Sequence, residues 1–225
     1  MVTNCVGTLI SPNYVLTAGH CIFKREPGKY EVKVGKRTPN EKLEQSYKVV
    51  EAIAHPDFVI ENPLPKFDFG LLKLESPVPN MNYIVCLPAD DSQQFVGANV
   101  TVSGWGRTIP NVPSISTVLQ TATLSIIDDS ICKKGYGTFF PWHMCASGAL
   151  TNSSTCMGDS GGTFQYFVQL FGTIKYFLLS LDQNNFCLNM FLFKPNVFDS
   201  LNVTTTLTYS CMTCFCFINS TMVRS

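Results

Sequence analysis

Three short motifs, spread along 225 residues, constrain the fold of this chain more than any other feature. Residues 158–162 read Gly-Asp-Ser-Gly-Gly, residues 17–21 read Thr-Ala-Gly-His-Cys, and residues 68–72 read Asp-Phe-Gly-Leu-Leu. A serine acts as a nucleophile only where a base takes its proton and donors receive the negative oxygen that its attack creates. Glycines beside Ser160 allow the tight backbone turn that would expose its hydroxyl. Each motif alone could be a turn or a strand end, but together they supply a nucleophile, a base and an orienting carboxylate.

The order of the three candidate residues, His20, Asp68 and then Ser160, restricts the fold further. Unrelated folds assemble serine, histidine and aspartate in different orders along the chain, so the order selects among them. The chain resembles the chymotrypsin family of serine proteases at all three motifs, which that family shows as Thr-Ala-Ala-His-Cys, Asp-Ile-Ala-Leu-Leu and Gly-Asp-Ser-Gly-Gly. Further stretches match the family in the same order, at residues 5–10, 103–106 and 144–146.

The resemblance implies a role for each member of this triad. His20 would be the general base, Asp68 would orient and stabilise its ring, and Ser160 would attack the substrate carbonyl. The N–H groups of Gly158 and Ser160 would form the oxyanion hole. Asp57 is a rival for the role of Asp68. The apolar run after Asp68 favours Asp68, because the family buries that strand behind the histidine.

Short segments of alternating apolar residues predict an all-β fold. Tyr30, Val32 and Val34 share one face of a predicted strand, and residues 99–103 alternate in the same way. His55, in the stretch His55-Pro56-Asp57, lacks an apolar run like the one after Asp68 and is expected in a solvated loop. Periodicity alone leaves a sandwich and a barrel open. The resemblance implies two antiparallel β-barrels of the chymotrypsin type, with the active site in the cleft between them.

The resemblance divides one protease domain into an N-terminal barrel over residues 1–86 and a C-terminal barrel over residues 87–201. Residues 202–225 would be a divergent tail, because they lack the helical apolar stripe with which the family ends. The family's activation sequence does not precede Cys5, so we expect a chain truncated at its N-terminus, without the first strands of its first barrel. Asp159, which the family pairs with an ammonium group, would then be an unpaired buried charge.

Ten cysteines suit an oxidising compartment, and the resemblance implies a secreted protein with disulfide bonds. The family pattern pairs Cys5 with Cys21, Cys132 with Cys145, and Cys156 with Cys187. Cys211, Cys214 and Cys216 also cluster, but no second pair of ligands stands at zinc spacing. We therefore expect no metal site.

The charge balance excludes some classes of partner. Sixteen basic and sixteen acidic residues give a net charge of zero, which indicates neither a nucleic acid nor an acidic membrane surface. No uninterrupted apolar segment reaches the roughly 18 residues of a membrane-spanning helix. We expect a monomer without a cofactor. Its partners would be a protein or peptide substrate, and could include a protein inhibitor.

The residue six positions before the nucleophile forms the floor of the family's specificity pocket, and here it is Ser154. A serine cannot pair with a Lys or Arg side chain as an aspartate would, so cleavage of a chymotrypsin-like or elastase-like kind is favoured over a trypsin-like one. Met157, Ser180, Asp182 and Asn196 complete the predicted pocket. Side chains at positions 182 and 196 would narrow it, whereas Asp182 could instead attract a basic group, so the preference stays open.

Two functions compete at this point. The leading hypothesis is a serine endopeptidase that hydrolyses peptide bonds through an acyl-enzyme at Ser160. The alternative is a non-catalytic homologue, or an inactive fragment, that binds a protein partner through the same cleft. The complete triad favours the enzyme, and the absence of an activation sequence favours the alternative.

Overall fold

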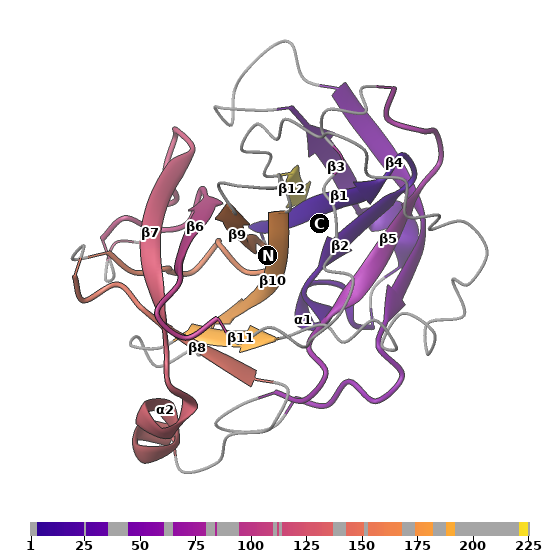
Figure 1. Ribbon diagram of the computed structural model, residues 1–225. Coiled ribbons are helices and arrows are strands. Elements are labelled where there is room, and N and C mark those ends of the chain that lie inside the picture. The colour runs from indigo at the N-terminus through magenta and orange to yellow at the C-terminus, as the bar shows by residue number, and fades with distance from the viewer. Residues whose placement is uncertain are drawn as a thin grey trace.

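The structure is a computed structural model with two antiparallel barrels, each built from six strands (Figure 1). It describes residues 4–24, 26–35, 45–60, 65–79, 84, 95–109, 112, 114–136, 143–150, 153–167, 174–181, 188–191 and 221–224. The predicted all-β, two-barrel fold is confirmed.

The first barrel contains five early strands and one late strand. These are β1 (Asn4–Ser11), β2 (Tyr14–Thr17), β3 (Glu31–Val34), β4 (Gln45–Ala54), β5 (Gly70–Leu74) and β12 (Thr221–Arg224). Around the barrel they follow the order β1-β12-β3-β4-β5-β2. The predicted alternation is confirmed, because Tyr30, Val32 and Val34 are buried in the barrel core while Glu31 is exposed. Two short helical turns, α1 (Gly19–Ile22) and η1 (Pro27–Lys29), connect β2 to β3.

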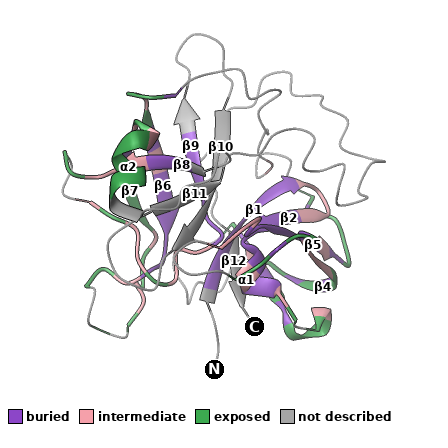
Figure 2. Cartoon of the chain, turned by 90° about the horizontal axis from the view of Figure 1, so that it is seen from below, coloured by how far each residue is buried: buried purple, intermediate pink, exposed green. Residues whose placement is uncertain are grey.

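The second barrel follows in the chain. Its strands are β6 (Asn99–Gly104), β7 (Gln120–Ile127), β8 (His143–Ser147), β9 (Thr163–Phe167), β10 (Ile174–Leu181) and β11 (Leu188–Phe191), in the order β10-β11-β8-β7-β6-β9. Val100 and Val102 of β6 are buried against Phe164, as the alternation predicts. Helix α2 (Asp129–Tyr136) lies on the outside and is largely exposed (Figure 2). None of the described helices is long and apolar enough to cross a membrane.

Strand β12 corrects the predicted organisation of the chain. Residues 202–225 were expected to be a divergent tail, and the first barrel was expected to lack its first strands. Instead Thr221–Arg224 pairs with β1 on one side and with β3 on the other. The physical reason is that an open edge presents unpaired N–H and C=O groups, which a short β-branched segment can satisfy.

The two barrels are joined by hydrogen bonds along β1. The Val6 N–H donates to the carbonyl of Ser160 at 2.7 Å. The hydroxyls of Thr8 and Thr163 are 2.9 Å apart and both buried. Val6 also packs against the buried indole of Trp105. The loop that carries Ser160 is therefore held by β1 of the first barrel as well as by its own barrel.

Candidate active site

Antiparallel pairing of β2 with β5 brings His20 and Asp68 together. Thr17, the last residue of β2, lies opposite Gly70, the first residue of β5. Because the strands run in opposite directions, the residues just after Thr17 and just before Gly70 meet at the same edge of the sheet. His20 lies in the first turn of α1, and Asp68 is two residues before β5. Strand register therefore brings together two residues that are 48 positions apart in the sequence (68 − 20).

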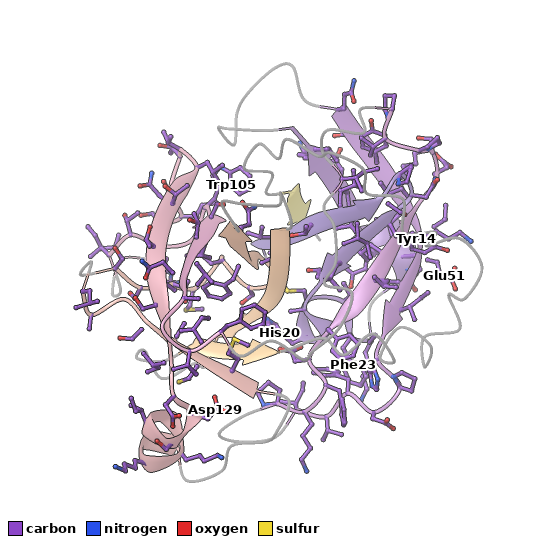
Figure 3. All side chains as sticks on the ribbon, viewed as in Figure 1. Tyr14, His20, Phe23, Glu51, Trp105 and Asp129 are labelled. Atoms are coloured by element: carbon purple, nitrogen blue, oxygen red, sulfur yellow. A yellow bond between two sulfur atoms is a disulfide. The ribbon has the colours of Figure 1, made fainter. Side chains whose placement is uncertain are left out.

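The carboxylate of Asp68 is fully buried and accepts two hydrogen bonds from one residue. Its Oδ2 lies 2.6 Å from His20 Nδ1, and its Oδ1 accepts from the His20 backbone N–H at 2.7 Å. A buried carboxylate is stable only when its oxygens are paired in this way. The His20 side chain is 33 % exposed and lies between the two barrels (Figure 3). Its Nδ1 is thus held by Asp68, while Nε2 is turned away from Asp68.

The rival aspartate, Asp57, and the neighbouring His55 are not part of the His20–Asp68 pair. The Asp57 side chain is 73 % exposed, and its backbone N–H donates to Nδ1 of His55 at 3.1 Å. The geometry therefore places Asp68, and not Asp57, against His20. The expectation that His55 is solvated is wrong, because His55 is only 6 % exposed. Its ring packs between Phe67 and Phe69, and aromatic residues on both sides of Asp68 were the sequence signal for this contact.

Ser160 is brought close to His20 through Cys21. The Cys21 Sγ lies 3.6 Å from His20 Nε2 and 4.0 Å from the Ser160 carbonyl oxygen. Within the described part of the chain, no hydrogen bond links the Ser160 hydroxyl to His20. The N–H groups of Gly158 and Ser160 also donate to no described acceptor. Gly158 has a φ of 103°, in the left-handed region that favours glycine, so this backbone turn depends on a residue without a Cβ.

Asp159 points away from His20, towards the body of the second barrel. Its Oδ1 accepts from the Gly106 N–H at 2.7 Å and its Oδ2 from the Cys156 N–H at 3.0 Å. A Cβ on Gly104 or Gly106 would collide with this carboxylate, so both glycines make room for it. Burial raises the pKa of Asp159, and the two backbone hydrogen bonds act in the opposite direction. The two N–H donors hold the Asp159 side chain on this side of the Ser160 loop.

The described cysteines include one disulfide that braces His20. Cys5 of β1 is bonded to Cys21, the residue after His20. Cys145 is also in a disulfide, and its partner lies outside the described side chains. The Cys132 side chain is not among those described, so its pairing with Cys145 stays a prediction. Cys156 has a free thiol, which contradicts its predicted pairing with Cys187, a residue outside the described ranges. A disulfide needs Cα atoms within about 7 Å, and a motif match alone could not establish that proximity.

Potential metal ligands lie close to His20 but are already bonded. The donor atoms of Cys5, His20 and Cys21 lie within 4.8 Å of one another. The two sulfurs, however, form the disulfide and offer no thiolate.

The predicted substrate pocket is described only in part. Ser154 is exposed and Met157 is 52 % exposed beside the Ser160 loop. Ser180 lies in β10 opposite Asn189, but its side chain is not among those described. Asp182 and Asn196 lie outside the described residues.

A cavity of about 260 Å³ lies behind the Ser160 loop. Ser154, Arg107 and Asp159 are among its lining residues, but His20 and Ser160 are not. A substrate carbonyl in this cavity would therefore not lie between the histidine and the serine.

Sequence comparisons support one family. The family model described as Trypsin matches residues 2–180. Alpha-fibrinogenase albofibrase of Trimeresurus albolabris is 34 % identical over 187 residues, which cover 76 % of this chain and 66 % of that protein. A trypsin of Saccharopolyspora erythraea is 32 % identical over 173 residues, which cover 76 % of this chain and 74 % of that protein. The chain thus spans slightly less than two thirds of the length of the Trimeresurus protein.

Two solved structures share the fold. Neuropsin, a serine protease of mouse brain, has a TM-score of 0.68 at 23 % identity, over 84 % of this chain and 86 % of its own. An inactivated protease paralogue of the scabies mite has a TM-score of 0.72 at 21 % identity, over 88 % of each chain. With the two barrels, the His20–Asp68 contact and the family match over residues 2–180, the chain belongs to the trypsin family of serine proteases.

Proposed function

We propose that this protein is a serine endopeptidase that hydrolyses peptide bonds through an acyl-enzyme at Ser160. The observation that carries the proposal is the buried Asp68 carboxylate on His20 Nδ1, at 2.6 Å. A proton on Nδ1 leaves Nε2 with its lone pair, which is the form that can accept a proton from a serine. Asp68 also stabilises the imidazolium that forms when the proton arrives.

The reaction follows from these positions. The Ser160 oxygen attacks the substrate carbonyl while His20 Nε2 takes its proton, and the negative oxygen accepts from the N–H groups of Gly158 and Ser160. His20 then gives the proton to the leaving amine, which departs as the acyl-enzyme forms. Water then attacks the acyl-enzyme while His20 takes its proton, and the proton passes to the Ser160 oxygen as the carboxylic acid product leaves. Catalytic hydrogen bonds in unliganded enzymes are often long, and substrate binding would close the contact between Ser160 and His20.

Substrate choice would depend on Ser154. Because this side chain carries no charge, we propose that the protein does not prefer Lys or Arg before the cleaved bond. Peptide libraries that vary this residue would test the preference. A strong preference for Arg or Lys would contradict this assignment and point to Asp182.

The fold, the cysteines and the family also bear on the location, oligomeric state and partners of the protein. We propose a secreted monomer that needs no cofactor, with Cys5–Cys21 formed in an oxidising compartment. Its partners would be protein or peptide substrates and an inhibitor that enters the same cleft.

A second candidate is a non-catalytic homologue that binds a partner at this face. It is favoured by one observation, the lack of a hydrogen bond from the Ser160 hydroxyl to His20 among the described residues. The inactivated scabies mite paralogue has the same fold, so this fold alone does not require activity.

Labelling with a fluorophosphonate distinguishes the two functions. The probe bonds covalently to a serine that is activated by its base and oxyanion donors. We expect the oxidised chain to be labelled and Ser160→Ala to be unlabelled. Asp68→Asn should react far more slowly, by the roughly 10⁴-fold loss known for this substitution in the same triad. Asp57→Asn is the matched control and should react as the parent does. A folded chain that is not labelled would overturn the enzyme proposal and leave the binding function.

A further inference from the structure

His55 is attached to the segment that carries Asp68 although it belongs to a different part of the chain. It directly follows β4, whose last residue, Ala54, pairs with Gly70 at the start of β5. The His55 backbone N–H donates to the carbonyl of Phe69 at 3.0 Å. This bond extends the pairing of β4 and β5 by one step towards Asp68.

The His55 ring adds two side-chain contacts to that backbone bond. It stacks on the ring of Phe67, with centroids 4.8 Å apart and planes 14° apart. It also packs against Phe69, with centroids 4.6 Å apart and an angle of 58°. The N–H of Asp57 donates to Nδ1 and so fixes the plane of the ring. Burial lowers the pKa of His55, and the nearby Asp57 carboxylate acts in the opposite direction.

The segment between these two phenylalanines has an unusual backbone. Phe67 has a φ of 50°, in the left-handed region that large side chains rarely adopt. The Phe69 N–H donates to the Phe67 carbonyl at 2.8 Å, which closes a γ-turn with Asp68 at its centre. Such a backbone persists only where surrounding contacts hold it. The direction of the Asp68 carboxylate therefore depends on what holds Phe67 and Phe69.

We propose that His55 is a positioning residue for the catalytic triad. Its ring holds Phe67 in the left-handed conformation, its N–H holds Phe69, and Asp68 is thereby aimed at His20. The expected effect of His55 on catalysis rests on the proposed function, whereas its expected effect on the His20–Asp68 hydrogen bond does not. Because His55 does not contact the reacting atoms, its loss should lower kcat and leave KM unchanged.

Matched variants separate the ring from the hydrogen bond. His55→Phe keeps an aromatic ring and loses the acceptor for Asp57, while His55→Asn keeps an acceptor and loses the ring. We expect His55→Asn to lower kcat by roughly tenfold to a hundredfold, the scale of a misplacement of about 1 Å. His55→Phe should stay within a few-fold of the parent. Phe67→Leu removes the stacked partner and should resemble His55→Asn, which provides a second variant if that one does not fold.

A direct measurement on His20 accompanies the kinetics. The Nδ1 proton shared with Asp68 gives a strongly deshielded NMR signal, which reports that hydrogen bond whether or not substrate is turned over. We expect the signal in the parent and in His55→Phe, and its loss in His55→Asn. Rates are normalised to the folded fraction measured by circular dichroism. Glu31→Gln, which changes an exposed carboxylate of β3, should alter neither reading.

The outcomes are distinct. A folded His55→Asn with parental kcat and the parental His20 signal would overturn the positioning role. Full loss in His55→Phe with retention in His55→Asn would overturn the role of the ring. A parent that hydrolyses no substrate would remove the proposed function, but the NMR comparison would still support or overturn the placement of Asp68 by His55.

Discussion

Gly161 shows how closely the Ser160 loop is fitted against the first barrel. It has a φ of 83°, in the left-handed region. A Cβ at this position would collide with the carbonyl of Val6 and the hydroxyl of Thr17, two residues of the other barrel. Thr17 in turn donates to the Val6 carbonyl at 2.8 Å, so neither atom can move freely. A single methyl group here would therefore push the nucleophile loop away from His20.

Three glycine substitutions separate backbone strain from collision. Gly161→Ala adds both, and we expect the free energy of unfolding to fall by more than about 2 kcal/mol, with loss of fluorophosphonate labelling. Gly97→Ala adds only strain, because its φ is 85° but nothing lies within 4 Å, and should cost about 1–2 kcal/mol. Gly28→Ala adds neither and should stay within about 0.5 kcal/mol. Equal losses in the first two variants, measured in urea, would contradict the collision.

Asp159 gives the stability of the protein a recognisable dependence on pH. Burial raises its pKa above the ordinary value of 3.8, so the folded protein holds this proton more tightly than the unfolded chain does. The stability that the protonated group contributes is therefore complete below pH 3.8 and is lost as the pH rises through the raised pKa. In Asp159→Asn the side chain does not titrate, so the unfolding free energy of this variant does not show the loss.

The measurement is the unfolding free energy of the parent minus that of Asp159→Asn, taken across pH. We expect this difference to fall as the pH rises above 3.8 and then to level off. Asp128 is a control of opposite sign, because hydrogen bonds from Ser130 lower its pKa. The parent minus Asp128→Asn should fall as the pH drops instead. A flat curve for Asp159 would show that its carboxyl titrates alike in both states.

At the scale of elements, β12 decides whether the first barrel is closed. Val223 lies opposite Cys5 of β1 and opposite Val32 of β3, so this strand has neighbours on both sides. A proline cannot donate to either neighbour and is confined to edge strands. Cys5 is also the disulfide partner of Cys21, so β12 supports the strand that braces His20.

A proline substitution in β12 tests its place in the barrel. We expect Val223→Pro to lower the unfolding free energy by at least about 1 kcal/mol for the lost backbone hydrogen bond, and to promote aggregation through the exposed edges. Ser225→Pro, just beyond the strand, is the matched control and should have little effect. Denaturant unfolding and light scattering would measure both. Parental stability in Val223→Pro would show that β12 does not close the barrel in solution.

The sequence could predict the elements around His20, Asp68 and Ser160 because each motif is local and lies next to an apolar strand. It could not predict β12, because four residues with no distinctive pattern pair with β1 and β3 from the other end of the chain. His55 was missed for a related reason, since its contacts with Phe67 and Phe69 depend on strand register. The predicted pairing of Cys156 was wrong because it rested on the family pattern alone, which does not show whether two cysteines are close in space.

At the scale of the whole molecule, the candidate site depends on how the two barrels are joined. Thr8 and Thr163 are buried on opposite barrels and bond to each other at 2.9 Å. Removing one hydroxyl leaves the other buried without a partner, which costs about 1–3 kcal/mol, whereas removing both can be nearly neutral.

A double-mutant cycle measures this junction. We expect Thr8→Val and Thr163→Val each to lower the unfolding free energy by about 1–3 kcal/mol, and the double variant to be much closer to the parent than their sum. Strict additivity of the two losses would mean that the hydroxyls do not interact. The single variants should also label more slowly at Ser160, because the Val6 N–H on the same strand holds its carbonyl.

The position of β12 also determines the order in which this protein can be completed during synthesis. Asn4 of β1 lies opposite Arg224 of β12, so the first barrel needs a strand that is synthesised after those of the second. All described strands of the second barrel, from β6 to β11, precede residue 192, so that barrel can form while the first is still open. Domains usually fold from the N-terminus as they emerge, and contacts distant in sequence form slowly. Because β12 follows every described strand of the second barrel in the chain, the His20 barrel can close only after the strands of the Ser160 barrel have been synthesised.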